Sequence, residues 1–256
     1  MKIILSVYGV CDIGCKTPNN EDMLLLGDVI FRDGSMKKEF AITDDADGSG
    51  GYNRVVIAVA DGVGGLEKGE VASEMALSRL REFLERIPDD LNNKELEEVF
   101  DVYAQETHSA MSSGMGSTIA GLFLYRGKVF RFHAGDSRIY LLRNGGLTRL
   151  TTDHSLRETG GNLSAPTNII TNALGGPGSA FIEFAEIEQP FSTGNIYLLS
   201  SDGLHDLVSS AVISDTLILS QTDKTEAAEK LLALAKEKGG LDNISTITIK
   251  VEEKKV

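Results

Sequence analysis

Acidic side chains follow two of the most apolar runs in the chain. In VVIAVADGVGG, residues 55–65, six apolar residues lead into Asp61, and Gly62 comes next. In NIYLLSSDGL, residues 195–204, an apolar run leads through two serines to Asp202. A short apolar run bounded by turn residues predicts a buried strand. Each carboxylate is therefore expected at the end of a rigid strand, beside a glycine that lets other atoms approach the backbone closely.

Three further segments place carboxylates at strand ends. Asp242 precedes an alternating strand, Asp136 lies in a predicted β-ribbon that returns at residues 144–146, and Glu21 and Asp22 precede another apolar run. Taken singly, each aspartate could cap a turn. Taken together, and without histidine or cysteine in the same positions, they indicate a site for a hard cation, magnesium or manganese rather than zinc.

Composition and charge narrow the functional classes. The 256 residues carry a formal net charge of -13, with 41% hydrophobic and 25% charged residues, as in a soluble globular protein. The acidic balance argues against nucleic-acid binding, which depends on Lys and Arg. No apolar run is long enough to span a bilayer. Two cysteines are too few for a disulfide framework or a closed zinc site, so reduced thiols and a cytoplasmic protein are expected.

The elements that must position the carboxylates are strands with few helices. The N-terminal run, residues 1–14, is interpreted as a first strand rather than a signal peptide, because no small-residue cleavage site follows. Apolar stripes predict helices over residues 67–87, 94–113 and 225–238. Two adjacent helices among many strands favour an antiparallel α+β layering. No linker or repeat interrupts the chain, so residues 1–256 are expected to form a single domain.

One acidic, glycine-rich segment, residues 32–53, invites comparison with a calcium-binding loop. Aligning Gly48 with the invariant glycine of that loop puts Thr43 at the first ligand position and Arg54 at the last, so the pattern fails. A solvated hairpin or loop is expected there.

The order of these motifs resembles a known family. In sequence they are NNED (19–22), DGVGG (61–65), GSTIAG (116–121), GDSRIYLL (135–142), TTDHS (151–155), TNALG (171–175), SSDGL (200–204) and GGLDNIS (239–245). Nearly the whole chain resembles the PPM family of metal-dependent serine/threonine protein phosphatases, the type-2C class, in its compact bacterial form. The resemblance implies a four-layer αββα sandwich, two antiparallel sheets flanked by helices, with a dinuclear metal centre at one end.

The same resemblance implies which residues hold two Mn²⁺ or Mg²⁺ ions. Asp61 would be shared by both ions and the Gly62 carbonyl would bind one of them. Asp202 and Asp242 would bind the other ion. Asp136, together with Asp202, corresponds to the third-metal site of bacterial members.

The catalytic assignments and the reaction also follow from the resemblance. Asp61, with Glu21 and Asp22 acting through metal-bound water, would support the direct attack of a metal-activated water on phosphorus. The expected substrate is phosphoserine or phosphothreonine on a protein, so the enzyme would reverse a serine/threonine kinase in a signalling pathway. A monomer is expected, without a nucleic-acid or membrane partner.

Two departures from the family pattern affect the site. Thr17 occupies the position of a phosphate-binding arginine, with Lys16 beside it, and Val63 replaces a histidine of eukaryotic members. His154 and His205 are expected to have structural hydrogen-bonding roles. The segment between TTDHS and TNALG is short and rich in Gly, Asn and Pro, which predicts a loop in place of a helical flap.

The departures leave an alternative, a pseudophosphatase that binds phosphoproteins without turnover. Thr17 and Val63 favour it, whereas the presence of Asp61, Asp202 and Asp242 argues against it. A site for structural calcium only has little support.

Overall fold

The computed structural model describes residues 2–42, 54–63, 68–159, 169–176, 178–221 and 226–254. These residues form two six-stranded antiparallel sheets and five helices. The first half contains β1 (Lys2–Asp12), β2 (Asp22–Leu26), β3 (Val29–Phe31), β4 (Gly34–Ile42), β5 (Arg54–Asp61), α1 (Gly69–Arg86), α2 (Asn93–Ala110), β6 (Ile119–Tyr125) and β7 (Lys128–Ala134). The second half contains β8 (Arg138–Arg143), β9 (Gly146–Arg149), β10 (Glu183–Glu186), β11 (Ile196–Ser200), α3 (Asp202–His205), α4 (Ser210–Leu219), α5 (Ala227–Glu237) and β12 (Ile244–Lys254).

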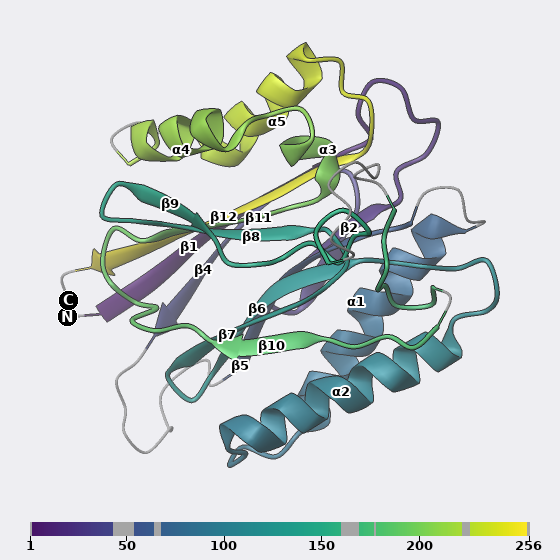
Figure 1. The fold of residues 1–256 in the computed structure, drawn as a ribbon. Helices are drawn as coiled ribbons and strands as arrows, with labels where there is room; N and C mark the ends of the chain where they lie inside the picture. Colours follow the sequence, from purple (N-terminus) through teal and green to yellow (C-terminus); the bar gives the residue numbers. More distant parts are fainter. Residues whose placement is uncertain are drawn as a thin grey trace.

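The elements stack in four layers, as Figure 1 shows. One sheet has the order β4-β1-β12-β11-β8-β9 and is covered by α3, α4 and α5. The other has the order β10-β7-β6-β5-β2-β3 and is covered by α1 and α2. One apolar core lies between the sheets, and a separate core lies under each helical layer. The predicted αββα sandwich is confirmed.

Strand β5, which ends at Asp61, is buried on both faces, and this explains its unbroken apolar sequence. Alternate residues from Val55 to Val59 face the core between the sheets, and those from Val56 to Ala60 face the helices. Each buried valine or isoleucine contributes about 1.5–3 kcal/mol relative to an exposed side chain. The strand is therefore held on both faces, which fixes the position of the aspartate at its end.

Three of the five described helices follow the sequence patterns. Helices α1, α2 and α5 lie where amphipathic stripes predict them, and α2 begins with a capping box between Asn92 and Glu95. The expectation of three helices was wrong, because α3 and α4 form as well, and α4 covers a segment without an apolar stripe. Ile213 and Leu217 of α4 are buried, whereas Leu219 is exposed, so apolar residues lie on more than one side.

Two expectations about strands need correction. The segment predicted as irregular, residues 32–53, contains β4, which pairs along β1; residues 43–53 lie outside the described residues. Asp136 does not lie within a continuous ribbon. Strands β7 and β8 belong to different sheets, so Asp136 lies where the chain crosses between them. The β8–β9 hairpin itself forms as predicted, with Asn144 in its turn at φ 51°.

The two ends of the chain belong to the same sheet. Strand β1 pairs with β12 from Lys2 opposite Lys254 to Asp12 opposite Ile244. Both cysteines are free thiols, Cys11 buried and Cys15 exposed. Within the described residues, no helix combines the length and the apolar character that crossing a membrane requires.

Candidate metal centre

Carboxylates from both sheets meet at one end of the sandwich. Asp22 begins β2 and Asp61 ends β5, and the two are direct partners across the antiparallel pair. Asp202 follows β11 of the other sheet, separated from that strand only by Ser201. The Ser201 hydroxyl donates to Asp22 Oδ2 at 2.7 Å, which joins the two sheets at this end. The predicted convergence of strand-end carboxylates is therefore present.

Glycines allow the carboxylate-bearing turns to approach one another. A Cβ on Gly203 would lie only 1.9 Å from the carbonyl oxygen of Asn243, so a side chain there would separate Asp202 from the turn that carries Asp242. A Cβ on Gly62 would lie 2.4 Å from the carbonyl oxygen of Gly69. The glycine beside each strand-end aspartate thus serves close backbone contact with a neighbouring segment.

The carboxylates destabilise one another's charged forms. Asp22 is fully buried, its Oδ1 has no hydrogen-bond partner among the described residues, and burial raises its pKa to about 6. Burial, and then the charges of Asp22 and Asp202, raise the pKa of Asp61 well above its usual range. Burial, followed by Asp136 and Asp242, does the same for the pKa of Asp202. A bound cation would offset this repulsion.

Asp136 joins the same electrostatic group from the crossover between the sheets. It is 7% exposed, and burial followed by the charge of Asp153 raises its pKa to about 6. Thr118 connects its turn to Asp61: Thr118 Oγ1 accepts from the Asp61 N–H at 3.2 Å and lies 2.8 Å from the Ser137 hydroxyl. Thr118 lies in the GSTIAG motif, and no local pattern in the sequence indicates this link.

The available donor atoms suit a hard cation. They are carboxylate oxygens together with the Gly62 carbonyl, which accepts no hydrogen bond from the described residues. All-oxygen donor sets favour magnesium, manganese or calcium over zinc. In the described part of the chain, one group of three acidic, His or Cys residues has its ligand atoms within 4.8 Å of one another, and it is His133, His154 and Glu183. The strand-end aspartates do not form such a group of three.

The N-terminal loop is attached to this end by Asn243, which is 5% exposed. Asn243 Nδ2 lies 2.9 Å from the carbonyl oxygens of both Ile13 and Asn19. Its Oδ1 accepts from the Glu21 N–H at 2.8 Å. These bonds place Glu21 beside the Asp242 turn. Asn243 lies in the GGLDNIS motif, where nothing in the local sequence indicates this role.

Thr17 and Lys16 lie on the same loop with different surroundings. The Thr17 hydroxyl donates to the Ile13 carbonyl and accepts from Asn243 Nδ2 at 2.8 Å, so it is engaged inside the loop. Lys16 is exposed and forms no ion pair with the described residues. Of these two predicted phosphate-binding residues, only Lys16 has a side chain directed to solvent without a partner in the described structure.

The raised pKa of Asp22 predicts how the metal-free protein responds to pH. The folded protein binds this proton more tightly than the unfolded chain, whose carboxyl pKa is 3.8, so stability is lost as pH rises from about 4 through 6. We expect Asp22→Asn to stabilise the metal-free protein by about 2–3 kcal/mol at pH 7.5 and by about half as much at pH 5. Urea unfolding of both proteins in excess chelator measures the difference; an equal effect at both pH values would contradict it.

Comparison with known proteins agrees with this architecture. A family model described as protein phosphatase 2C matches residues 40–235. The serine/threonine phosphatase Stp of Listeria welshimeri is 33% identical over 216 residues, which are 77% of this chain and 84% of that protein. A structure of the S. agalactiae serine/threonine phosphatase has a TM-score of 0.75 at 27% identity and covers 97% of this chain and 100% of its own.

A second solved structure was determined with metal. The catalytic domain of the serine/threonine phosphatase PstP, in complex with 2 manganese ions, has a TM-score of 0.71 at 27% identity, covering 98% of this chain and 100% of that one. The family match extends over most of the chain and includes the turns of Asp61, Asp136 and Asp202. The chain therefore belongs to the protein phosphatase 2C family.

Proposed function

We propose that this protein is a metal-dependent serine/threonine phosphatase that hydrolyses phosphoserine and phosphothreonine in proteins. The observation that carries the proposal is the meeting of Asp22, Asp61, Asp202 and Asp242 at one end of the two sheets, where Asp22 and Asp61 are direct strand partners. Burial and the neighbouring carboxylates raise the pKa values of Asp22, Asp61 and Asp202, and bound cations would offset this cost at neutral pH. Family membership supports the reaction.

The position of each residue supports a distinct role toward two Mn²⁺ or Mg²⁺ ions. Asp61 would be shared by both, since its charge interacts with Asp22 on its own sheet and with Asp202 and Asp242 from the other. The Gly62 carbonyl would bind one of these two ions. Asp202 and Asp242 would hold the second ion. The close contact between Gly203 and the Asn243 carbonyl brings the turns of these two aspartates together.

Three further carboxylates would surround this pair. Asp136 would hold a third, weaker ion together with Asp202. After burial, the charge of Asp136 is the largest cause of the raised pKa of Asp202. Glu21 and Asp22 would act through water: Asp22 Oδ2 accepts from the Ser201 hydroxyl, and Oδ1, which has no partner among the described residues, would accept from a water. When bound, such ions activate a water for attack and neutralise the transferring phosphoryl group. They also reverse the acidic character of the site, which admits a phosphate dianion.

Removal of metal tests the proposal directly. We expect hydrolysis of p-nitrophenyl phosphate and of a phosphothreonine peptide with manganese present, loss of both activities in excess EDTA, and recovery when manganese is returned. Activity should be lost in EDTA because the carboxylates alone cannot activate a water for in-line attack as a divalent cation does. Full activity in chelator would refute the metal mechanism. Manganese binding without turnover of either substrate would support the pseudophosphatase instead.

Lys16 is the cation that we expect to contact the substrate phosphate. Lys16→Ala should raise KM for a phosphothreonine peptide about tenfold, because a hydrogen bond to a charged group is worth roughly 1.5–3 kcal/mol. The contact is the same in ground and transition states, so kcat should change little. Lys16→Arg keeps the charge and serves as the control. Equal KM values in all three proteins would remove Lys16 from the site. A higher KM in Thr17→Val, without a change in Lys16→Ala, would also remove Lys16.

The cellular setting is also a proposal. We place the enzyme in the cytoplasm, as a monomer that opposes a serine/threonine kinase in a signalling pathway. The pairing of β1 with β12 supports a single phosphatase domain over residues 1–256, because strands far apart in the sequence are neighbours in one sheet. Sedimentation analysis tests the monomer, and a phosphoproteome comparison with and without the gene tests the substrates.

A further inference from the structure

His154 holds both backbone polar groups of Gly135, the residue before Asp136. The backbone N–H of His154 donates to the Gly135 carbonyl at 3.0 Å, and the ring Nδ1 of His154 accepts from the Gly135 N–H at 3.2 Å. His154 is 1% exposed, so neither bond competes with bulk water. One residue, distant in sequence, therefore fixes the start of the turn that carries Asp136.

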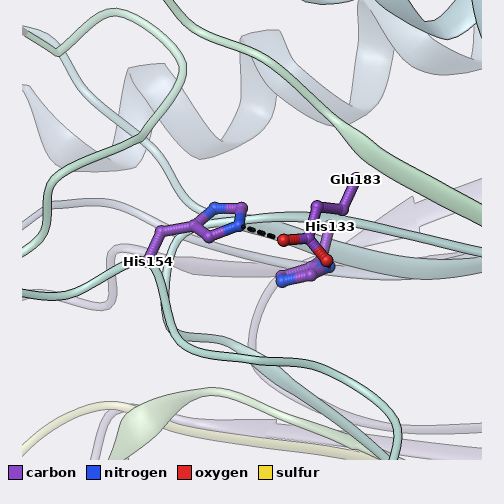
Figure 2. Close-up of side chains that lie close together, drawn as sticks. All are labelled: His133, His154 and Glu183. Atoms are coloured by element: carbon purple, nitrogen blue, oxygen red, sulfur yellow. Dashed lines mark hydrogen bonds and ion pairs between the residues drawn. The ribbon is translucent and has the colours of Figure 1, made fainter. Parts of the chain in front are cut away.

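The orientation of the His154 ring is itself fixed. Asn172 Nδ2 donates to Nδ1 at 2.8 Å, and Asn172 cannot be rotated, because it also donates to the Phe181 carbonyl and accepts from the Phe181 N–H. With two donors directed at Nδ1, the ring hydrogen must be on Nε2. Figure 2 shows this Nε2 directed at Glu183, whose Oε1 accepts at 3.1 Å.

The same three side chains, His133, His154 and Glu183, have the spacing of a cation site, with ligand atoms within 4.8 Å. His133 Nε2 lies 3.0 Å from the Thr152 carbonyl, and its buried Nδ1 has no hydrogen-bond partner in the described structure. A cation here would need the Nε2 lone pair of His154. That would require Nδ1 to carry the hydrogen and to give up both of its donors. The hydrogen bonds therefore favour a positioning network over a ligand set.

Gly135 is also confined on its other side. Its φ is +103°, and a Cβ there would lie 2.7 Å from the Thr118 Cβ. Thr118 is the residue that contacts both Asp61 and Ser137. The Gly135–Ser137 turn is thus held between Thr118, which connects it to the central aspartate, and His154, which connects it to residues 171–183. The backbone on both sides of Asp136 is therefore held in place.

We propose that His154 is a positioning residue for Asp136, and that it sets the affinity of the ion held there. Through the Gly135 N–H it holds the Asp136 carboxylate where Asp202 can share an ion with it, and Asn172 and Glu183 keep its ring in the required orientation. The inference rests on the proposed function, because it assumes a metal ion at Asp136. Groups that orient a ligand typically alter metal affinity 10–100-fold when removed.

Replacements of His154 separate the acceptor from the donor. Asparagine places an oxygen near the position of Nδ1 and can still accept from Gly135, whereas glutamine places its amide near Nε2 and can still donate to Glu183. We expect His154→Ala and His154→Gln to weaken the weakest manganese site about tenfold, and His154→Asn to restore most of that affinity. The readout is manganese binding, followed by the EPR signal of free Mn²⁺, with Asp136→Asn marking complete loss of this ion.

Controls distinguish positioning from general damage. His108 Nδ1 accepts from the Gly175 N–H at 3.1 Å, a bond of the same kind away from Asp136, so His108→Ala should leave manganese binding unchanged. His133→Gln should also leave the number of bound ions unchanged, and loss of an ion would overturn the proposal by making the histidine cluster a metal site. Unfolding in chelator checks the fold of each variant; if His154→Ala is unfolded, the Asn and Gln variants decide.

Failure of the inference is distinguishable from failure of the proposed function. Wild-type affinity in His154→Ala, or equal loss in the Asn and Gln variants, would overturn the positioning role while the phosphatase assignment stands. A wild-type protein that binds no manganese would overturn both.

Discussion

Asp61→Asn is expected to lower kcat roughly 1,000-fold or more. Asp61 ends a strand buried on both faces and interacts with carboxylates from both sheets, so its loss affects every proposed ion together. A metal clamp supplies several kcal/mol of transition-state stabilisation, and each 1.36 kcal/mol is a factor of ten. The measurement is the turnover of a phosphothreonine peptide at saturating manganese.

The fold should survive this change. Removing one of several mutually repelling charges leaves the metal-free protein as stable as the wild type or more so, which urea unfolding in chelator measures. Asp101→Asn, on the exposed face of α2, is the matched control and should keep normal activity. A near-normal rate in Asp61→Asn would show that the two ions do not share this carboxylate.

Asn243→Asp is expected to be the most destabilising conservative change near the site. Asparagine donates to the carbonyls of Ile13 and Asn19, and aspartate of the same shape cannot. Each buried acceptor left unpaired costs about 1–3 kcal/mol, and the new charge adds to the repulsion around Asp242. We expect a loss of about 3 kcal/mol or more in the free energy of unfolding, together with weaker manganese binding.

The position of Asn243 makes this effect specific. Asn93→Asp, at the exposed start of α2, keeps the acceptor for Lys128 and loses the donor to Glu186; exposed pairs of this kind are worth about 0–1 kcal/mol, so stability should change by no more than about 1 kcal/mol. Urea unfolding with and without manganese separates the structural loss from the metal contribution. If Asn243→Asp unfolded at the wild-type urea concentration, the bonds to the N-terminal loop would contribute nothing to holding Glu21 near the site.

Local patterns in the sequence were sufficient for the elements whose burial is regular. The run from Val55 to Ala60 predicted a strand covered on both faces, since a continuous apolar stretch ending in an aspartate has few other stable environments. The amphipathic stripes predicted α1, α2 and α5, and the order of the acidic motifs predicted the family and the αββα sandwich. The ligand roles of individual aspartates stay predictions until metal binding is measured.

Tertiary structure decided how those pieces meet. No local signal marks the chain's crossing from one sheet to the other between β7 and β8, because each strand has the same alternation wherever its partner lies. Helix α4 lacked a stripe, since it has apolar residues on more than one side. The roles of Asn243 and His154 depend on hydrogen bonds to Glu21, 222 residues away, and to Gly135, 19 residues away. A side-chain amide or imidazole has the same local sequence signature whichever backbone it finally holds, so only the folded chain shows which turn each one fixes.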